Sequence, residues 1–143
     1  MKSIVLAIAL LALACPSHLW ACKPSPEWTR LGIDEQMERL FGQSLVVAHV
    51  RVVEVLSKYP RREYDTGVER GRAAKVEVVE SFKGPADFSS VTSEMNSCGI
   101  DFWMGRELVI FSGEPLVLNS IRTRVNQEIP RVLPILRTLR DRK

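Results

Sequence analysis

Apolar and polar residues alternate along several stretches of this chain in the pattern of half-buried β-strands. Between Leu45 and Leu56 the even-numbered positions 46–52 are apolar, and the alternation slips at Val53. We therefore predict one long strand whose even positions face inward. A bulge at Val53 would let this strand bend and serve both sides of a barrel.

Shorter strands are predicted after this one. Alternating apolar residues run from Ala74 to Phe82 and end at a turn over residues 83–85. The preceding segment, from Tyr59 to Gly71, is rich in charge and predicts an exposed hairpin loop. The remaining strands are predicted at Ser89–Ser93, Leu108–Phe111 and Leu116–Leu118.

Helical spacing of apolar residues appears on both sides of the strands. Asp34 is suited to cap a short helix that buries Met37, Leu40 and Phe41 and stops at Gly42. A second helix is predicted in the tail by Val132, Ile135, Leu136 and Leu139. The pattern indicates an all-β fold, a five-stranded OB-like antiparallel barrel with a short N-terminal helix and a C-terminal helix. A small sandwich is the alternative.

The first residues have the layout of a secretory signal. After Lys2, an apolar run from Ile4 to Cys15 covers about a dozen residues, too few to span a bilayer. We predict a signal peptide at residues 1–21 and one domain at 22–143, with cleavage after Ala14 as the alternative. The protein is thus expected to be exported, to the periplasm or the extracellular space, without a transmembrane segment.

Each candidate cut falls just before a cysteine, Cys15 or Cys22. A bacterial lipoprotein signal is therefore an alternative, in which a lipidated cysteine anchors the protein to a membrane. Lipidation would block both the thiol and the amine of that residue. A chain that starts at an unmodified Cys22 instead keeps a free amino terminus.

Charge and cysteine content narrow the function classes. The formal net charge is only +3 at neutral pH, which argues against a dedicated nucleic-acid binder. After cleavage at Ala21 two cysteines remain, Cys22 and Cys98, and in an exported domain they most simply form one disulfide. That bond would fix the free amino terminus in space.

No catalytic or metal-binding motif is evident. His49 is the one histidine left after processing, and we place it on the outward face of its strand, with surface or packing as its expected role. The loop arginines Arg70 and Arg72 are expected to be solvated, with contact to an anionic surface as the alternative. We expect a binding protein with no enzymatic activity and no cofactor.

Several segments together resemble the netrin-like domains, the superfamily that includes the tissue inhibitors of metalloproteinases and their small bacterial relatives. The resemblance spans the chain from about Cys22 to Leu139. It is carried by residues 45–55, 76–84, 97–99 and 105–111, which read LVVAHVRVVEV, VEVVESFKG, SCG and GRELVIF. The family fold is an OB-type barrel.

The resemblance implies a specific activity. In the tissue inhibitors, the amine and carbonyl of the first cysteine bind the catalytic zinc of a protease, and the next side chain enters its specificity pocket. Cys22 would then be the zinc-chelating residue, Lys23 the pocket residue and Cys98 the disulfide partner of Cys22. Phe102 and Trp103, which follow Cys98 closely, are expected to pack in the core, with a contact ridge beside the amino terminus as the alternative. The implied partner is a protein, in the sharpest form a zinc metalloprotease.

Overall fold

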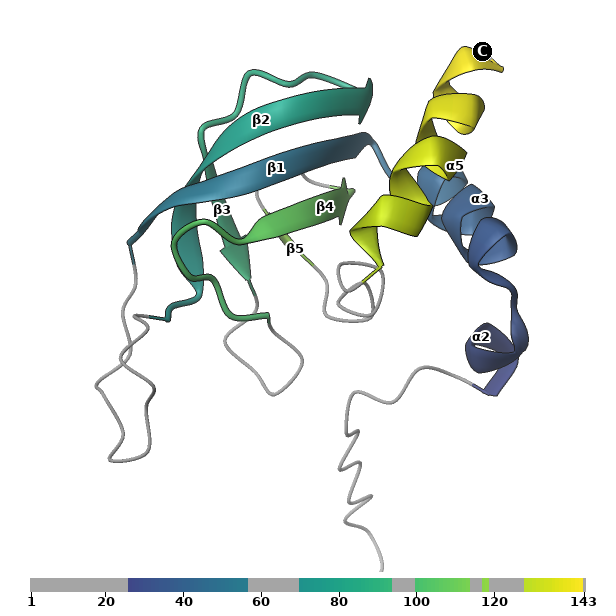
Figure 1. Ribbon diagram of the computed structural model, residues 1–143, viewed down its shortest axis with the longest axis horizontal. Helices are drawn as coiled ribbons and strands as arrows, with labels where there is room; N and C mark the ends of the chain where they lie inside the picture. The colour runs from purple at the N-terminus through teal and green to yellow at the C-terminus, as the bar shows by residue number, and fades with distance from the viewer. Residues whose placement is uncertain (1–25, 57–69, 94–99, 114–116, 119–127, 143) are drawn as a thin grey trace, which may run out of the picture.

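The computed structural model describes residues 26–56, 70–93, 100–113, 117–118 and 128–142. A curled sheet lies beside a group of helices, with α3 and α5 next to each other near one end of the strands (Figure 1). The elements are α2 Pro26–Arg30, α3 Ile33–Gln43, β1 Val46–Val55, β2 Ala73–Lys83, β3 Ser90–Ser93, β4 Glu107–Ser112, β5 Val117–Leu118 and α5 Ile129–Asp141.

The sheet has the strand order β4-β1-β2-β3-β5. Four strands, β4, β1, β2 and β3, form antiparallel pairs, which confirms the expected strand-rich architecture. The sequence predicted a sheet that is antiparallel throughout. The structure differs at one edge, because the two-residue strand β5 pairs with β3 in the parallel direction.

Bulges account for the curl of the sheet. The predicted irregularity at Val53 is confirmed, because the pairing of β1 with β2 shifts between Val52 and Glu54. Two further shifts leave Val79 and Phe82 of β2 without a direct partner on β1. Each shift changes which side of the sheet the next residue faces.

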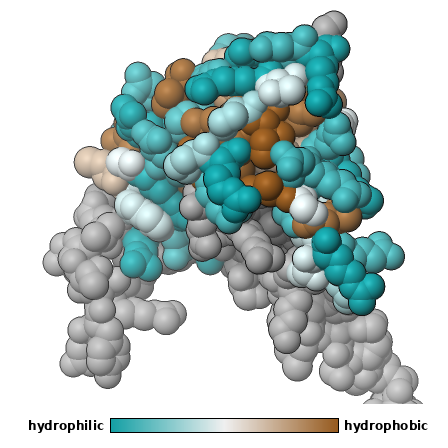
Figure 2. Space-filling model, turned by 45° about the vertical axis from the view of Figure 1, so that its right-hand side comes forward, coloured by the Kyte–Doolittle hydropathy of each residue, from teal (hydrophilic) through white to brown (hydrophobic). Residues whose placement is uncertain are grey.

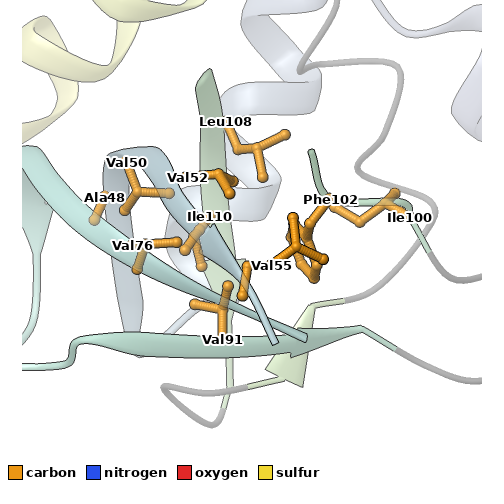
Figure 3. Packing of buried hydrophobic residues seen from close by; sticks show 11 residues of the cluster. Ala48, Val50, Val52, Val55, Val76, Val91, Ile100, Phe102, Leu108 and Ile110 are labelled. Carbon is orange, nitrogen blue, oxygen red and sulfur yellow. The ribbon is translucent and has the colours of Figure 1, made fainter. Parts of the chain in front are cut away.

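The inner face of the sheet carries the main apolar core. Side chains from β1, β2, β3 and β4 converge there with Ile100 and Phe102 (Figure 3). The even positions Ala48, Val50 and Val52 face this core, as the alternation predicted, whereas Val46 is buried but belongs to neither apolar cluster. Valine dominates the cluster because β-branched side chains pack well on a pleated surface.

A second core lies between the other face of the sheet and the helices. Val47, Val109 and Phe111 point away from the inner core and contact α3 and α5. The buried residues that the helices contribute to this core are Met37, Leu40, Phe41, Val132 and Leu136, and partly buried helix residues such as Trp28 of α2 pack against them. The odd positions Val47 and His49 of β1 are therefore buried too, which a barrel with a solvated outer face would not require.

Both ends of α3 differ from the prediction. Gly32, in an extended conformation, occupies the N-cap position, and Asp34 lies in the first turn instead. There its negative charge is favourable beside the positive end of the helix dipole. Gly42 does not stop the helix, which continues to Gln43 and is capped by Ser44.

Helix α5 is held to the sheet by a charged cluster as well as by apolar contacts. The shift at Val79 turns Glu80 toward the side of the helix. Its carboxylate accepts hydrogen bonds from Arg137 Nη2 at 2.8 Å and Arg140 Nη1 at 3.0 Å. The pKa of Glu80 is lowered, chiefly by its hydrogen bond to Arg137.

Candidate functional site

The described residues that bear on the predicted site lie on the segment between Ile100 and β4. The backbone of Phe102 bridges to Gly71, with Gly71 N donating to Phe102 O at 3.0 Å and Phe102 N donating to Gly71 O at 2.7 Å. Upstream, the Ile100 amide donates to Ser93 Oγ at 2.6 Å. These bonds fix the segment against two separate parts of the chain.

Phe102 is a core residue. Its ring is fully buried and lies near Val55 and Ile100 in the inner cluster (Figure 3). Phe102 therefore has the core-packing role expected of it, and its side chain is not available to the alternative contact ridge. Two successive residues on an extended segment point to opposite sides, so Trp103 need not share this environment.

Trp103 lies on the other side of this segment and is half-buried. It begins a β-turn closed by a hydrogen bond from Arg106 N to Trp103 O at 3.1 Å. Gly105 has a φ of 80°, the positive value that the third position of a type II turn requires. At the second position, Met104 is 71% exposed.

Strand β1 holds this turn in place. Gly105 N donates to Val52 O at 2.9 Å, and Val52 N donates to Arg106 O at 2.9 Å. The turn is thus part of the sheet framework. A side chain carried on it is positioned more rigidly than one on a free loop.

Two guanidinium groups lie over the Trp103 ring. The Arg106 guanidinium carbon is 4.0 Å from the ring centroid, and that of Arg70 is 5.7 Å away. Arg106 Nη1 also donates to the backbone carbonyl of Asp101. We call Arg70, Trp103, Met104 and Arg106 the Trp103 surface.

As far as the described residues go, the positive charges of this surface are incompletely balanced. Burial lowers the pKa of Arg106; the Asp101 carboxylate opposes this, and the nearby Arg70 lowers it further. This shift does not remove the charge of Arg106, since guanidinium groups do not lose their proton in proteins. Within the described ranges, neither Arg70 nor Arg106 forms an ion pair with a carboxylate.

Arg72 differs from the solvated side chain that the sequence had predicted. Its side chain is 15% exposed, and its Nε lies 3.4 Å from Asp101 Oδ1. The Asp101 carboxylate, which raises the pKa of Arg106, is thus shared with Arg72. Counting the described residues alone, Arg70 and Arg106 bring two positive charges to the Trp103 surface, and Asp101 is divided between Arg106 and Arg72.

His49 lies on the face away from the inner core, as predicted, but it is buried. Its Nε2 is 3.1 Å from Glu107 Oε2, and the other oxygen of Glu107 accepts a hydrogen bond from Arg51 Nη2 at 2.8 Å. The pKa of Glu107 is lowered, first by Arg51 and then by His49. The burial of His49 agrees with the packing role expected of it. Among the described residues no group of three or more metal-ligating side chains is present.

A groove of about 260 Å³ lies between α3 and α5. Its walls combine the acidic Asp34 and Glu38 with apolar side chains of α5, and Arg142 Nη1 donates to Glu38 Oε1 at 3.1 Å across it. None of the residues predicted to be functional lines this groove. Figure 2 shows a largely hydrophilic surface interrupted by a few apolar patches, without one dominant apolar face in that view.

Three predicted site residues, Cys22, Lys23 and Cys98, lie outside the described residues. The proposed disulfide and the zinc-chelating terminus therefore stay predictions. Sequence reasoning missed the association of Arg70 and Arg106 with Trp103. Arg106, three residues after Trp103 across a glycine turn, was the available signal.

No protein-family model matches this chain, and no curated protein matches it. Within the described ranges, no helix is both long enough and apolar enough to cross a membrane. Evidence for function therefore comes from the sequence and from the geometry of the molecule itself.

Proposed function

We propose that this chain is an exported binding protein without enzymatic activity, whose OB-like barrel presents the Trp103 surface to a protein partner. The observation that carries the proposal is the half-buried Trp103 ring under two arginines on a turn bonded to β1. Tryptophan and arginine are the residues most often found at energetic hot spots of protein interfaces. Their framework is already ordered, so little entropy is lost when a partner binds.

The closed barrel is part of this proposal. The sheet order makes β4 and β5 the two ends of the sheet, and a barrel closes when its end strands pair. Cα atoms of β4 and β5 approach within 8 Å of each other, which supports closure. Closure would also remove the exposed edges that promote aggregation.

A narrower form of the proposal concerns the amino terminus. Removal of residues 1–21 would leave Cys22 first, and a Cys22–Cys98 disulfide would tie it two residues before Ile100, which is buried in the inner core. A catalytic zinc keeps one coordination position open for water, and an amine with a neighbouring carbonyl can displace that water. An α-amino group has a pKa near 8, so losing its proton at neutral pH costs only about 1 kcal/mol.

The metalloprotease-inhibitor activity implied by the netrin-like resemblance depends on this terminus. Pro24 stands where the tissue inhibitors carry a second cysteine, so any fixation of the terminus rests on a single disulfide. The alternative function is a non-inhibitory interaction module, with a structural disulfide or a lipid anchor at the cysteine. The Trp103 surface favours that alternative as a second candidate, because it needs no free amine.

Mass spectrometry of the exported protein separates the two functions. If the mature protein starts at an unmodified Cys22 that forms a disulfide with Cys98, the inhibitory function stays possible. An acylated cysteine or a start at Cys15 excludes it. For a free terminus, a panel of zinc proteases is assayed with the protein and with a variant carrying one alanine before Cys22. Equal inhibition by both forms would contradict chelation.

A further inference from the structure

We propose that the Trp103 surface binds an acidic segment of its protein partner, with Arg70 and Arg106 pairing with carboxylates and Met104 contacting an apolar side chain. This rests on the proposed function and names the chemistry of the partner. It depends on the charge of described residues, not on the state of the amino terminus.

The charges of the two arginines favour binding of an anion between them. They lie over one ring, and the charge of Arg70 lowers the pKa of Arg106, so each cation disfavours the other. Arg106 has also lost part of its hydration through burial. A carboxylate bound between the two guanidinium groups would relieve this repulsion and replace the lost water contacts.

The Arg106 side chain is already held in one position before a partner binds. The Arg106 guanidinium is held at two points, by the Trp103 ring beneath it and by the bond from its Nη1 to the Asp101 carbonyl. A guanidinium restrained in this way offers paired N–H groups that match the two oxygens of a carboxylate. Little side-chain entropy then remains to be lost on binding.

The small net charge and the neighbouring residues favour an acidic protein segment over a long anionic polymer as the ligand. Binding of nucleic acid or of a sulfated polysaccharide relies on many cations along a stripe, whereas the net charge of this chain is only +3. Asp101, which pairs with Arg72, lies beside Arg106 and would repel a dense polyanion. The adjacent Met104 offers apolar area, which suits a peptide carrying both carboxylates and apolar side chains.

The test is a titration by fluorescence anisotropy of the mature, oxidised protein. The probe is a short fluorescein-labelled peptide of glutamates with two leucines, and the matched probe has glutamine at every glutamate. We expect binding of the acidic probe alone. We expect Arg70→Gln, which changes an exposed side chain, and Trp103→Ala each to weaken it at least about tenfold.

Arg39→Gln is the matched control, because it removes one exposed guanidinium from α3, outside the Trp103 surface. We expect it to leave the affinity within about twofold. The indole N–H signal of Trp103 in a nitrogen–proton NMR spectrum should move during the titration, whereas that of Trp28 on α2 should not.

Three results would overturn the inference. They are no binding of the acidic probe up to millimolar concentration, equal loss with Arg39→Gln and Arg70→Gln, and tighter binding of a heparin fragment or an oligonucleotide that depends on the same arginines. None of them bears on Cys22, so failure here stays distinct from failure of protease inhibition.

Discussion

Replacing Phe102 with alanine should destabilise this protein by about 3–5 kcal/mol, whereas the same change at Trp103 should cost only about 1 kcal/mol. The two residues are neighbours in sequence with opposite environments. Phe102 is fully buried in the inner core, and Trp103 is half-buried on the turn outside it. Comparing the two alanine variants therefore tests whether Phe102 supports the core while Trp103 lies outside it.

The loss of unfolding free energy in Phe102→Ala should lie in the upper part of the 3–5 kcal/mol range, that is, about 4–5 kcal/mol. A cavity costs less where the surrounding backbone can collapse into it. Here the backbone N–H and C=O of residue 102 are both bonded to Gly71, and the Ile100 amide is bonded to Ser93 Oγ. The segment cannot easily move inward, so most of the ring volume would remain empty.

The assay is urea unfolding followed by far-ultraviolet circular dichroism. With a slope of about 2 kcal/mol per molar urea, the midpoint of Phe102→Ala should fall by roughly 2 M, and that of Trp103→Ala by about 0.5 M. Phe102→Leu serves as a graded control, because it keeps apolar volume and should recover most of the loss. Equal midpoints for the two alanine variants would refute the orientation of these side chains.

Two other features give clear expectations. Glu80→Gln should lower the melting temperature by a few degrees and flatten the acid limb of stability. The pKa of Glu80 is lowered in the folded state, so the contribution of Glu80 to stability is complete above the unfolded pKa and is lost as the pH falls through the folded pKa. Thermal melts of both proteins between about pH 7 and pH 3 measure this loss. If the melting temperatures of the two proteins fell in parallel with pH, the expectation would be contradicted. Gly84→Ala should destabilise by more than about 1 kcal/mol, since φ is 74° and a Cβ would collide with the Leu45 carbonyl. Its matched control, Gly42→Ala in an open position inside α3, should stabilise by roughly 0.5–1 kcal/mol; destabilisation by Gly42→Ala would show that α3 ends at that glycine.

The strands were predictable because a period of two is a local signal. The bounds of β1 and β2 agree with the predicted runs, and the slip at Val53 marked a real bulge. The shifts at Val79 and Phe82 were not predictable, because Phe82 continues the even alternation in sequence while its side chain packs in the second core. Which side a residue faces after a bulge depends on the partner strand, and that information is not local.

The helices and the site show a similar division. Apolar spacing located α3 and α5, but Gly42 misled because an exposed glycine in the last turn costs only about 1 kcal/mol, which tertiary contacts can offset. At the site, core packing was the expected role of Phe102 and Trp103, and the structure buries Phe102 fully but Trp103 only in part. Arg70 reaches Trp103 from the start of a different segment, a contact across 33 positions that no local pattern encodes.

The placement of Trp103 also explains how this fold can carry a binding surface at little cost to stability. Trp103 and Met104 belong to neither apolar cluster, yet the turn that carries them is bonded to Val52, a member of the inner core. Changes in these two side chains leave both clusters filled, while the backbone bonds keep their positions fixed. Arg106 is the exception, since its guanidinium is partly desolvated and bonded to Asp101. Binding specificity should therefore change most freely at Trp103, Met104 and Arg70, whereas substitution of Arg106 should affect both binding and the stability of the turn.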